Sequence, residues 1–230
     1  MIIRRRVATW HRDDLRLSHA LIDSFASDME LQALDTLNHY ERGKQLHFEE
    51  IEGEDQGNVV EEYRGLNDMD FDFRSLFRDY FPSLQRRSAF LTVWGYFEHQ
   101  LNELCSLYKD EKSYTVDLSD IAGRGIDRST KYLAKVAGLN MRQDSQEWRT
   151  IKQLGALRNA IAHQDGKLVT KKGNPSVELI SLVDNSPFLA KDGDDVLLKQ
   201  GFVMFVVDAF RTYFGLIGES IKQRESSSQP

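Results

Sequence analysis

The sequence has one cysteine, four prolines and no long hydrophobic run among its 230 residues. A lone cysteine, Cys105, cannot form a disulfide within the chain or hold a structural zinc ion by itself, and this indicates a reducing compartment. The longest apolar run, Phe202 to Val207, is far shorter than the ~20 residues that cross a bilayer. Polar residues stand near the N-terminus where a signal peptide needs an apolar core. We therefore expect a cytoplasmic globular protein without a membrane span.

The excess of one charge sign is also small, because 30 basic and 36 acidic residues give a net charge of −6. The acidic excess is concentrated between residues 49 and 62, which hold seven acidic residues and no basic one. Residues 121–172 have the opposite bias, with eleven basic and four acidic residues. A basic segment of this kind suits a polyanion such as RNA, although basic runs are often only solvated surface. Charge alone leaves both interpretations open.

Apolar residues recur every three or four positions over most of the chain, which predicts helices. In the first helix the predicted apolar face begins at Leu17 and Leu21. Residues 167–183 are typical of a β-hairpin around a turn at Gly173. The predicted helices cover about 17–43, 83–108, 121–139, 145–165 and 196–222.

These elements predict an all-α fold, a helical bundle with an N-terminal helical arm and a small β-hairpin inserted before the last helix. The arm covers residues 1–48. An acidic loop or linker is expected over 49–70, because acidic residues and glycine disfavour packing. The helical domain then covers 71–225, and the Ser-rich tail 226–230 is expected to be disordered.

Two apolar features raise questions of packing. Aromatic residues alternate with arginines over residues 71–81, where they could stack nucleobases, but burial of a short helix is the more common use of such residues. We assign no site to them. The last helix is apolar on more than one face, since Phe202, Val203 and Phe210 point in different directions. Such a helix is either central or at a subunit interface.

The common phosphate-binding, dinucleotide-binding, zinc and serine-hydrolase motifs are missing, and the six histidines are scattered. We therefore expect no metal site and no cofactor. The feature that stands out is a polar cluster of Arg158, Asn159 and His163 in a segment otherwise made of Ala, Leu and Ile. Asn159 and His163 are four residues apart and share a helix face, where the amide can orient the imidazole.

The cluster reads Arg158-Asn159-x-x-x-His163 and resembles the R-x4-6-H signature of HEPN domains (higher eukaryotes and prokaryotes nucleotide-binding). The surroundings are similar too, with a long helix before the motif and an apolar helix after it, so the resemblance covers about residues 76–222. It implies a dimeric helical bundle, in many members a metal-independent endoribonuclease of toxin–antitoxin, abortive-infection or other anti-phage systems. Other members bind nucleotides or act only as interaction modules.

The resemblance implies that Arg158 and His163 are catalytic, with Asn159 beside them. An imidazole can accept or donate a proton while the ribose 2′-hydroxyl attacks the adjacent phosphate, and a guanidinium can stabilise the anionic phosphorane. On a regular helix, residues five apart diverge by ~140°. Either the long Arg158 side chain folds back, or two copies of the motif meet across a two-fold axis, as in the composite dimer site of the family.

Each of these residues also has a purely structural interpretation. His163 could only interact with the helix dipole, and Arg158 could pair with a carboxylate such as Glu98. Glu98 and Asn102, one turn apart on the helix over 83–108, are candidate supporting residues for the site. The candidate RNA-binding residues form a basic stripe on the helix over 121–139, at Arg124, Arg128, Lys131 and Lys135.

We therefore expect a metal-independent endoribonuclease of the HEPN type that cleaves RNA at a composite dimer site, in a toxin–antitoxin or anti-phage system. The alternative is a non-catalytic HEPN-like module that dimerises and binds RNA, a nucleotide or a protein. The expected partners are RNA, a second copy of the chain, and an antitoxin or other defence protein, with no membrane partner. A purely structural bundle explains the core but not the polar cluster.

Overall fold

The computed structural model describes residues 6–49, 57–69, 72–73, 75–169 and 172–227, which are mostly helical with two small antiparallel sheets. The helices are α1 (Leu15–Gly43), α2 (Phe81–Lys112), α3 (Gly125–Lys135), α4 (Gln146–Gln164), α5 (Val177–Asp184) and α6 (Phe202–Ser227), with shorter turns η1 (Val7–Thr9), η2 (Trp10–Asp14), η3 (Ser75–Tyr80) and η4 (Leu118–Asp120). The strands are β1 (Gln45–Glu49), β2 (Asn58–Tyr63), β3 (Leu66–Asn67), β4 (Leu189–Asp192) and β5 (Asp195–Leu198). The helical bundle is therefore confirmed, but the fold is not purely α.

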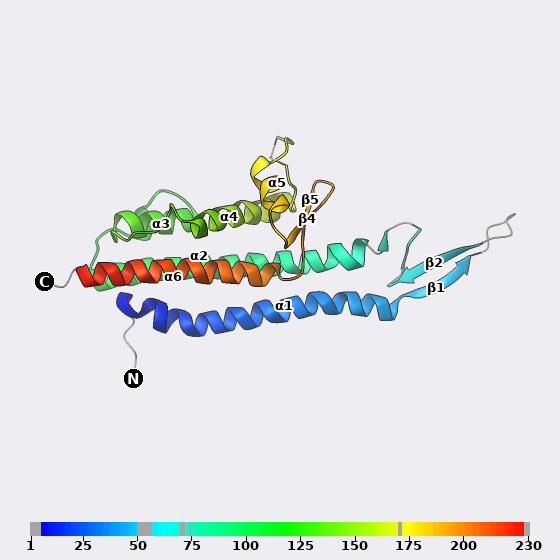
Figure 1. Ribbon diagram of the computed structural model, residues 1–230, viewed down its shortest axis with the longest axis horizontal. Helices are drawn as coiled ribbons and strands as arrows, with labels where there is room; N and C mark the ends of the chain where they lie inside the picture. The colour runs from blue at the N-terminus through cyan, green and yellow to red at the C-terminus, as the bar shows by residue number, and fades with distance from the viewer. Residues whose placement is uncertain (1–5, 50–56, 70–71, 74, 170–171, 228–230) are drawn as a thin grey trace.

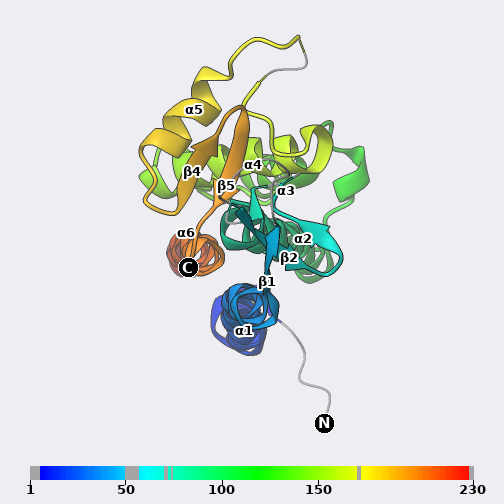
Figure 2. The same ribbon diagram turned by 90° about the vertical axis from the view of Figure 1, so that its right-hand side faces the viewer.

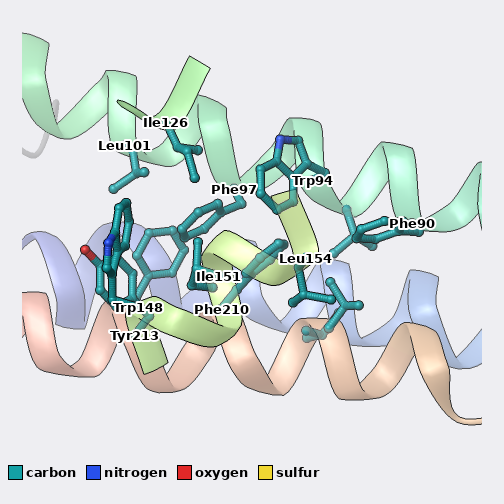
Figure 3. Packing of buried hydrophobic residues seen from close by; sticks show 14 of the residues in the cluster. Phe90, Trp94, Phe97, Leu101, Ile126, Trp148, Ile151, Leu154, Phe210 and Tyr213 are labelled. Carbon is teal, nitrogen blue, oxygen red and sulfur yellow. The ribbon is translucent and has the colours of Figure 1, made fainter. Parts of the chain in front are cut away.

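The three long helices α1, α2 and α6 run side by side along the molecule (Figure 1, Figure 2). A second layer, made of α3 and α4, lies on α2 and α6, and α5 with the β4–β5 hairpin covers one end of α4. The main core forms where the two layers meet. Figure 3 shows it between α2, α4 and α6.

The predicted apolar stripe of α2 is confirmed, because every one of its residues is buried. Phe97 on α2 stacks on Phe210 of α6 with ring centroids 4.1 Å apart, and Trp94 meets the same ring edge-on at 5.7 Å (Figure 3). Burying side chains of this size stabilises the fold by roughly 1.5–3 kcal/mol each. The buried stripe consists of Phe90, Trp94, Phe97, Leu101, Leu104 and Tyr108.

Helix α1 packs along α2 and α6, so it is part of the bundle instead of a separate arm. It ends at Gly43, as predicted, but its buried face differs from the predicted one. Leu17 and Leu21 are 67% and 65% exposed, whereas Ala33 and Tyr40 of the predicted face are buried, and the first half of the helix buries Leu15, Ile22 and Ala26 instead. The buried face also contains a charged residue with a partner on α2.

That residue is Glu30, whose Oε2 accepts a hydrogen bond from Nε of Arg86 at 2.8 Å. Both side chains are almost completely buried. The second oxygen, Oε1, accepts from the backbone N–H of Val203 at 3.2 Å, in the first turn of α6. A buried charge is tolerable only when it is paired and hydrogen-bonded in this way. One carboxylate therefore connects α1, α2 and α6.

Both ends of α4 agree with the prediction. Its N-cap is Ser145, whose Oγ accepts from the backbone N–H of Trp148 at 3.1 Å. At the other end Asp165 and Gly166 adopt left-handed conformations with φ of 52° and 76°. The N–H of Gly166 donates to the carbonyl of Ala160 at 3.0 Å, which closes the helix.

A hairpin does precede α6, but the prediction placed it too early. Residues 177–184 form helix α5, which begins after Ser176 because the Ser176 hydroxyl accepts from the N–H of Leu179. The hairpin is β4–β5, with Gly193 at positive φ in its turn. The last helix consequently starts at Phe202 and not near residue 196. Residues 170–171 of the predicted hairpin lie outside the described residues.

The predicted acidic loop over 49–70 is wrong for its described part, where β1, β2 and β3 form an antiparallel sheet in that order. This sheet extends from the end of the bundle (Figure 1). A small aromatic cluster of Tyr40, Tyr63, Phe73 and Phe77 joins it to α1 and η3. The predicted burial of the aromatic segment is thereby confirmed for the two phenylalanines. Residues 50–56, 70–71 and 74 lie outside the described residues.

Helix α6 is central, which answers the question raised by its apolar faces. It packs against α1, α2 and α4, so one chain covers the faces that contain Phe202, Val203 and Phe210. The apolar character of α6 is therefore no reason to expect a dimer. None of the helices in the described part of the chain combines the length and apolarity that a bilayer-spanning segment requires. The helix continues to Ser227, and residues 228–230 of the expected tail lie outside the described residues.

Candidate active site

A cavity of about 700 Å³ opens between α2, the start of α3, the second half of α4 and α5. We call it the α4 cavity. All three residues of the polar cluster line it, namely Arg158, Asn159 and His163. The sequence prediction that these residues share one site is therefore consistent with their placement in a single chain.

Arg158 lines the α4 cavity and hydrogen-bonds to its neighbour in sequence. Its Nη1 donates to Oδ1 of the neighbouring Asn159 at 3.1 Å, which bends the guanidinium toward the face that carries His163. The half-buried Arg158 and the exposed His163 both line the cavity despite their separation around the helix. Both residues therefore line one cavity within a single chain.

Asn159 differs from its predicted role. Within the described residues its amide hydrogen-bonds to Arg158, and no hydrogen bond joins it to His163. The shared helix face places Asn159 and His163 along the same cavity, but the amide oxygen of Asn159 accepts its hydrogen bond from Arg158. Asn159 therefore orients the guanidinium, while the imidazole is exposed and oriented by no hydrogen bond within the described part of the chain.

Glu98 lies across the cavity on α2. Its Oε1 accepts from the indole Nε1–H of Trp94 at 3.0 Å. Gly125 also approaches it so closely that a Cβ there would lie 2.6 Å from the same oxygen. Among the described residues Glu98 forms no ion pair with Arg158, the pairing that the structural interpretation gave as its example. Glu98 is therefore a fixed carboxylate of the cavity wall.

Asn102, the second candidate supporting residue, is not at the site. Its Oδ1 accepts from the hydroxyl of Ser129 and so joins α2 to α3. One turn along α2 is enough to move the side chain from the cavity wall to the α2–α3 contact. Sequence spacing alone could not separate these two positions.

The predicted basic stripe is divided by the structure. Arg124, the N-cap residue of α3, is exposed and lines the cavity. The other three residues follow along α3, where Lys131 donates to the carbonyl of Ala122 at 3.3 Å and Lys135 is exposed at the end of the helix. Arg128 is half-buried. Only the start of the stripe therefore belongs to the cavity.

Lys152 is a cavity residue that the prediction missed. It lies one turn before Gly155 on α4, and its Nζ is 3.0 Å from Oδ1 of Asp127 on α3. The signal was present in the sequence, because Lys152, Asn159 and His163 stand at i, i+7 and i+11 and so share one helix face. The prediction considered only the six positions of the motif and not the rest of that helix face.

The charges of the lining are mixed. Three cations and three carboxylates face the α4 cavity, and among the described residues Lys152 and Asp127 form the ion pair. Arg124 and Arg158 pair with no described carboxylate, so their guanidinium groups remain available to an anion. A guanidinium binds a phosphate with two parallel hydrogen bonds, which suits it to a nucleic-acid backbone. The cations are Arg124, Lys152 and Arg158, and the carboxylates are Glu98, Asp127 and Glu178.

The described residues contain no group of three or more His, Cys, Asp or Glu side chains placed to hold a metal ion. What the α4 cavity does offer is an imidazole that can transfer a proton and guanidinium groups that can stabilise a developing negative charge. Comparisons of the chain with protein-family models, with curated proteins and with solved structures found no match. The resemblance to HEPN domains therefore depends on the motif and its position in the bundle.

Proposed function

We propose that this protein is a metal-independent endoribonuclease of the HEPN type. The observation that carries the proposal is the convergence of Arg158, Asn159 and His163 on one cavity that can hold a phosphodiester and a ribose. An arginine without a carboxylate partner beside an exposed histidine suits anion binding and proton transfer better than it suits stability.

In the proposed reaction His163 accepts the proton of a ribose 2′-hydroxyl while the 2′-oxygen attacks the adjacent phosphorus. The bond from phosphorus to the 5′-oxygen breaks, and the departing oxygen takes a proton from the imidazolium. Arg158 stabilises the negative charge of the phosphorane. The products are a 2′,3′-cyclic phosphate and a 5′-hydroxyl end, so atoms and protons balance without another reactant.

The proposed setting is the cytoplasm, in a toxin–antitoxin or anti-phage system. This part comes from the resemblance to HEPN domains, as do the expected antitoxin or other defence partner and the homodimer. Arg124, which has no described carboxylate partner, supplies a second guanidinium at the cavity for the phosphates of a bound RNA strand.

The test is incubation of the wild-type protein, Arg158→Ala and His163→Ala with total RNA in the presence of EDTA. We expect cleavage by the wild type, 2′,3′-cyclic phosphate ends, and a loss of orders of magnitude in both variants. Unchanged melting temperatures would exclude unfolding as the cause. Because the guanidinium and imidazole supply the charge and the proton, chelation should have no effect. Loss of cleavage in EDTA, or normal cleavage by both variants, contradicts the mechanism.

Mixing the two inactive variants distinguishes a one-chain site from a composite dimer site. If each α4 cavity acts alone, Arg158→Ala mixed with His163→Ala stays inactive. A composite site regains activity in the mixed dimer, because one interface then combines an intact arginine with an intact histidine from the other chain. Light scattering on the same samples gives the oligomeric state. A protein that binds RNA but does not cleave it would be the non-catalytic HEPN-like module.

A further inference from the structure

The end of α4 determines where His163 lies. His163 and Gln164 belong to the last turn of the helix, and both line the α4 cavity. The last four carbonyls of a helix have no partner inside it, so the final turn frays unless something outside holds it. A frayed last turn would move His163 more than Arg158, because Arg158 lies more than a turn earlier.

Arg87 on α2 contacts the residue that follows this last turn. Its Nη1 donates to the carbonyl of Asp165 at 3.1 Å, and its Nη2 donates to the carbonyl of Val196 on β5 at 2.6 Å. The Asp165 carboxylate lies 3.4 Å away, but that side chain is 78% exposed, whereas the arginine side chain is 5% exposed. The buried guanidinium is thus held mainly by two backbone carbonyls from different elements.

The backbone at this point is shaped to admit the guanidinium. Gly166 has φ of +76°, and a Cβ at this position would lie 2.9 Å from Cζ of Arg87. The carbonyl of Gly166 in turn accepts from the N–H of Val196 at 3.0 Å. Glycine therefore serves two needs here, the left-handed turn and the close approach of Arg87. The result is a three-way junction between α2, the end of α4 and β5.

The neighbouring Arg86 is equally buried but serves a different contact. Its hydrogen bonds within the described residues go to Glu30 and to the carbonyl of Leu198. Consecutive arginines on one helix thus point to two sides. One side is the contact of α2 with α1 and with Leu198 of β5, and the other is the end of the helix that carries the polar cluster.

We propose that Arg87 is a positioning residue for the candidate site, a role that rests on the proposed function for its catalytic consequence. By bridging the carbonyls of Asp165 and Val196 it fixes the last turn of α4 and holds His163 and Gln164 at the cavity. Its positive charge at the C-terminal end of α4 also interacts favourably with the helix dipole. Arg87 does not line the cavity, so it acts on a substrate only through the position of the histidine.

The test compares Arg87→Lys with Arg86→Lys in the full chain. Lysine keeps the charge but lacks the planar group that reaches two carbonyls at once. We expect Arg87→Lys to lower kcat for RNA cleavage by at least about tenfold while KM changes much less. The NMR signals of the His163 ring should shift and broaden, and inorganic phosphate added to the sample should perturb them less. Arg86→Lys should leave these values unchanged even if it melts at a lower temperature.

Gly166→Ala approaches the same contact from α4, since the added methyl displaces the guanidinium, and it should reproduce the effects of Arg87→Lys. Wild-type His163 signals and kcat in a folded Arg87→Lys variant would overturn the positioning role. So would equal changes in Arg86→Lys, because these would indicate a general loss of stability. If the wild type does not cleave RNA, the proposed function fails, and the His163 spectrum of the variants still decides the role of Arg87.

Discussion

Nη1 of Arg158 donates to Oδ1 of Asn159 at 3.1 Å, and this hydrogen bond between adjacent residues aims the guanidinium along the face of His163. The Nε of Arg158 is buried and has no hydrogen-bond acceptor among the described residues. The arginine is therefore restrained by a neutral amide and keeps its full charge. A carboxylate in the same place would restrain it equally well but would neutralise it.

Substitutions of Asn159 should separate restraint from charge. Asn159→Ala removes the restraint, so we expect cleavage to fall about tenfold because the guanidinium is no longer held in one orientation. Asn159→Asp keeps a hydrogen-bond acceptor but pairs with Arg158, so phosphate affinity should fall more than in the alanine variant. Asn159 is exposed, and thermal melting should change little in either case. Phosphate titrations and initial rates measure both effects. Full activity in Asn159→Ala would show that the contact is incidental.

Charge reversal along α3 should have graded effects on RNA binding. Arg124 lines the cavity, whereas Lys135 lies at the other end of α3, about 16 Å away at ~1.5 Å per residue. We expect Arg124→Glu to weaken binding and to reduce the slope of log affinity against log salt by about 0.7 or more for single-stranded RNA. Lys135→Glu should have the smaller effect. Equal effects would indicate that RNA follows the whole of α3.

Two glycines should respond to alanine with opposite signs. Gly125→Ala forces a Cβ into a left-handed position and against Glu98, so we expect a loss of about 2 kcal/mol and a shift of the Trp94 indole N–H signal. Gly95 lies in the middle of α2 with open space around its Cβ position. Gly95→Ala should stabilise the fold by about 0.5–1 kcal/mol. Urea denaturation measures both changes. If Gly125→Ala left the free energy of unfolding unchanged, the Glu98 side chain would be able to move away from Trp94 at little cost.

Acidification should destabilise the contact between α6 and the N-terminal residues. Burial lowers the pKa of His11 and His19, with further lowering by Lys222 for His11 and by Arg211 for His19. Because the pKa in the folded chain lies below the ordinary value of 6.5, the folded state gains no proton where the unfolded chain does. The stability contributed by the neutral rings is present above that value and is lost as the pH falls below it.

The matching variant is His19→Phe, which keeps a ring against Phe214 but cannot titrate. Stacking at 5.9 Å between these two rings supports the choice. We expect its melting temperature to fall less than that of the wild type between about pH 7.5 and about pH 5.5. If the melting temperatures of His19→Phe and the wild type fell in parallel with pH, protonation of His19 would not be the cause of the acid destabilisation.

The sequence was most informative where local patterns and tertiary packing agree. The apolar stripe of α2 and the Ser145 cap of α4 depend on neighbours within one or two turns, and both were predicted. The polar cluster was found for a similar reason, since its residues are close in sequence. The hydrogen bonds within the cluster could not be predicted, because the acceptor of Arg158 depends on side-chain geometry.

Long-range contacts account for the errors. Leu17 and Leu21 were expected inside, but the start of α1 buries Leu15, Ile22 and Ala26 against the other helices, a choice that depends on contacts distant in sequence. By its pattern alone, the apolar run at 177–183 suits a strand and a short helix equally well. The Ser176 cap and the packing of this segment on α4 favour the helix. Arg87 gave no signal at all, because both of its main acceptors are backbone carbonyls far along the chain.

The carboxylate of Glu30 also has a consequence for the order of folding. Its acceptor bond to Val203 joins residues 173 positions apart, and α6 supplies one wall of the core that backs α2 and α4. Contacts of such long sequence separation form late and slowly. During synthesis the apolar stripes of the earlier helices therefore stay exposed until α6 can pack against them. The polar cluster on α4 and its contact with Arg87 precede α6 in the chain, but the core that backs α4 is completed only with α6.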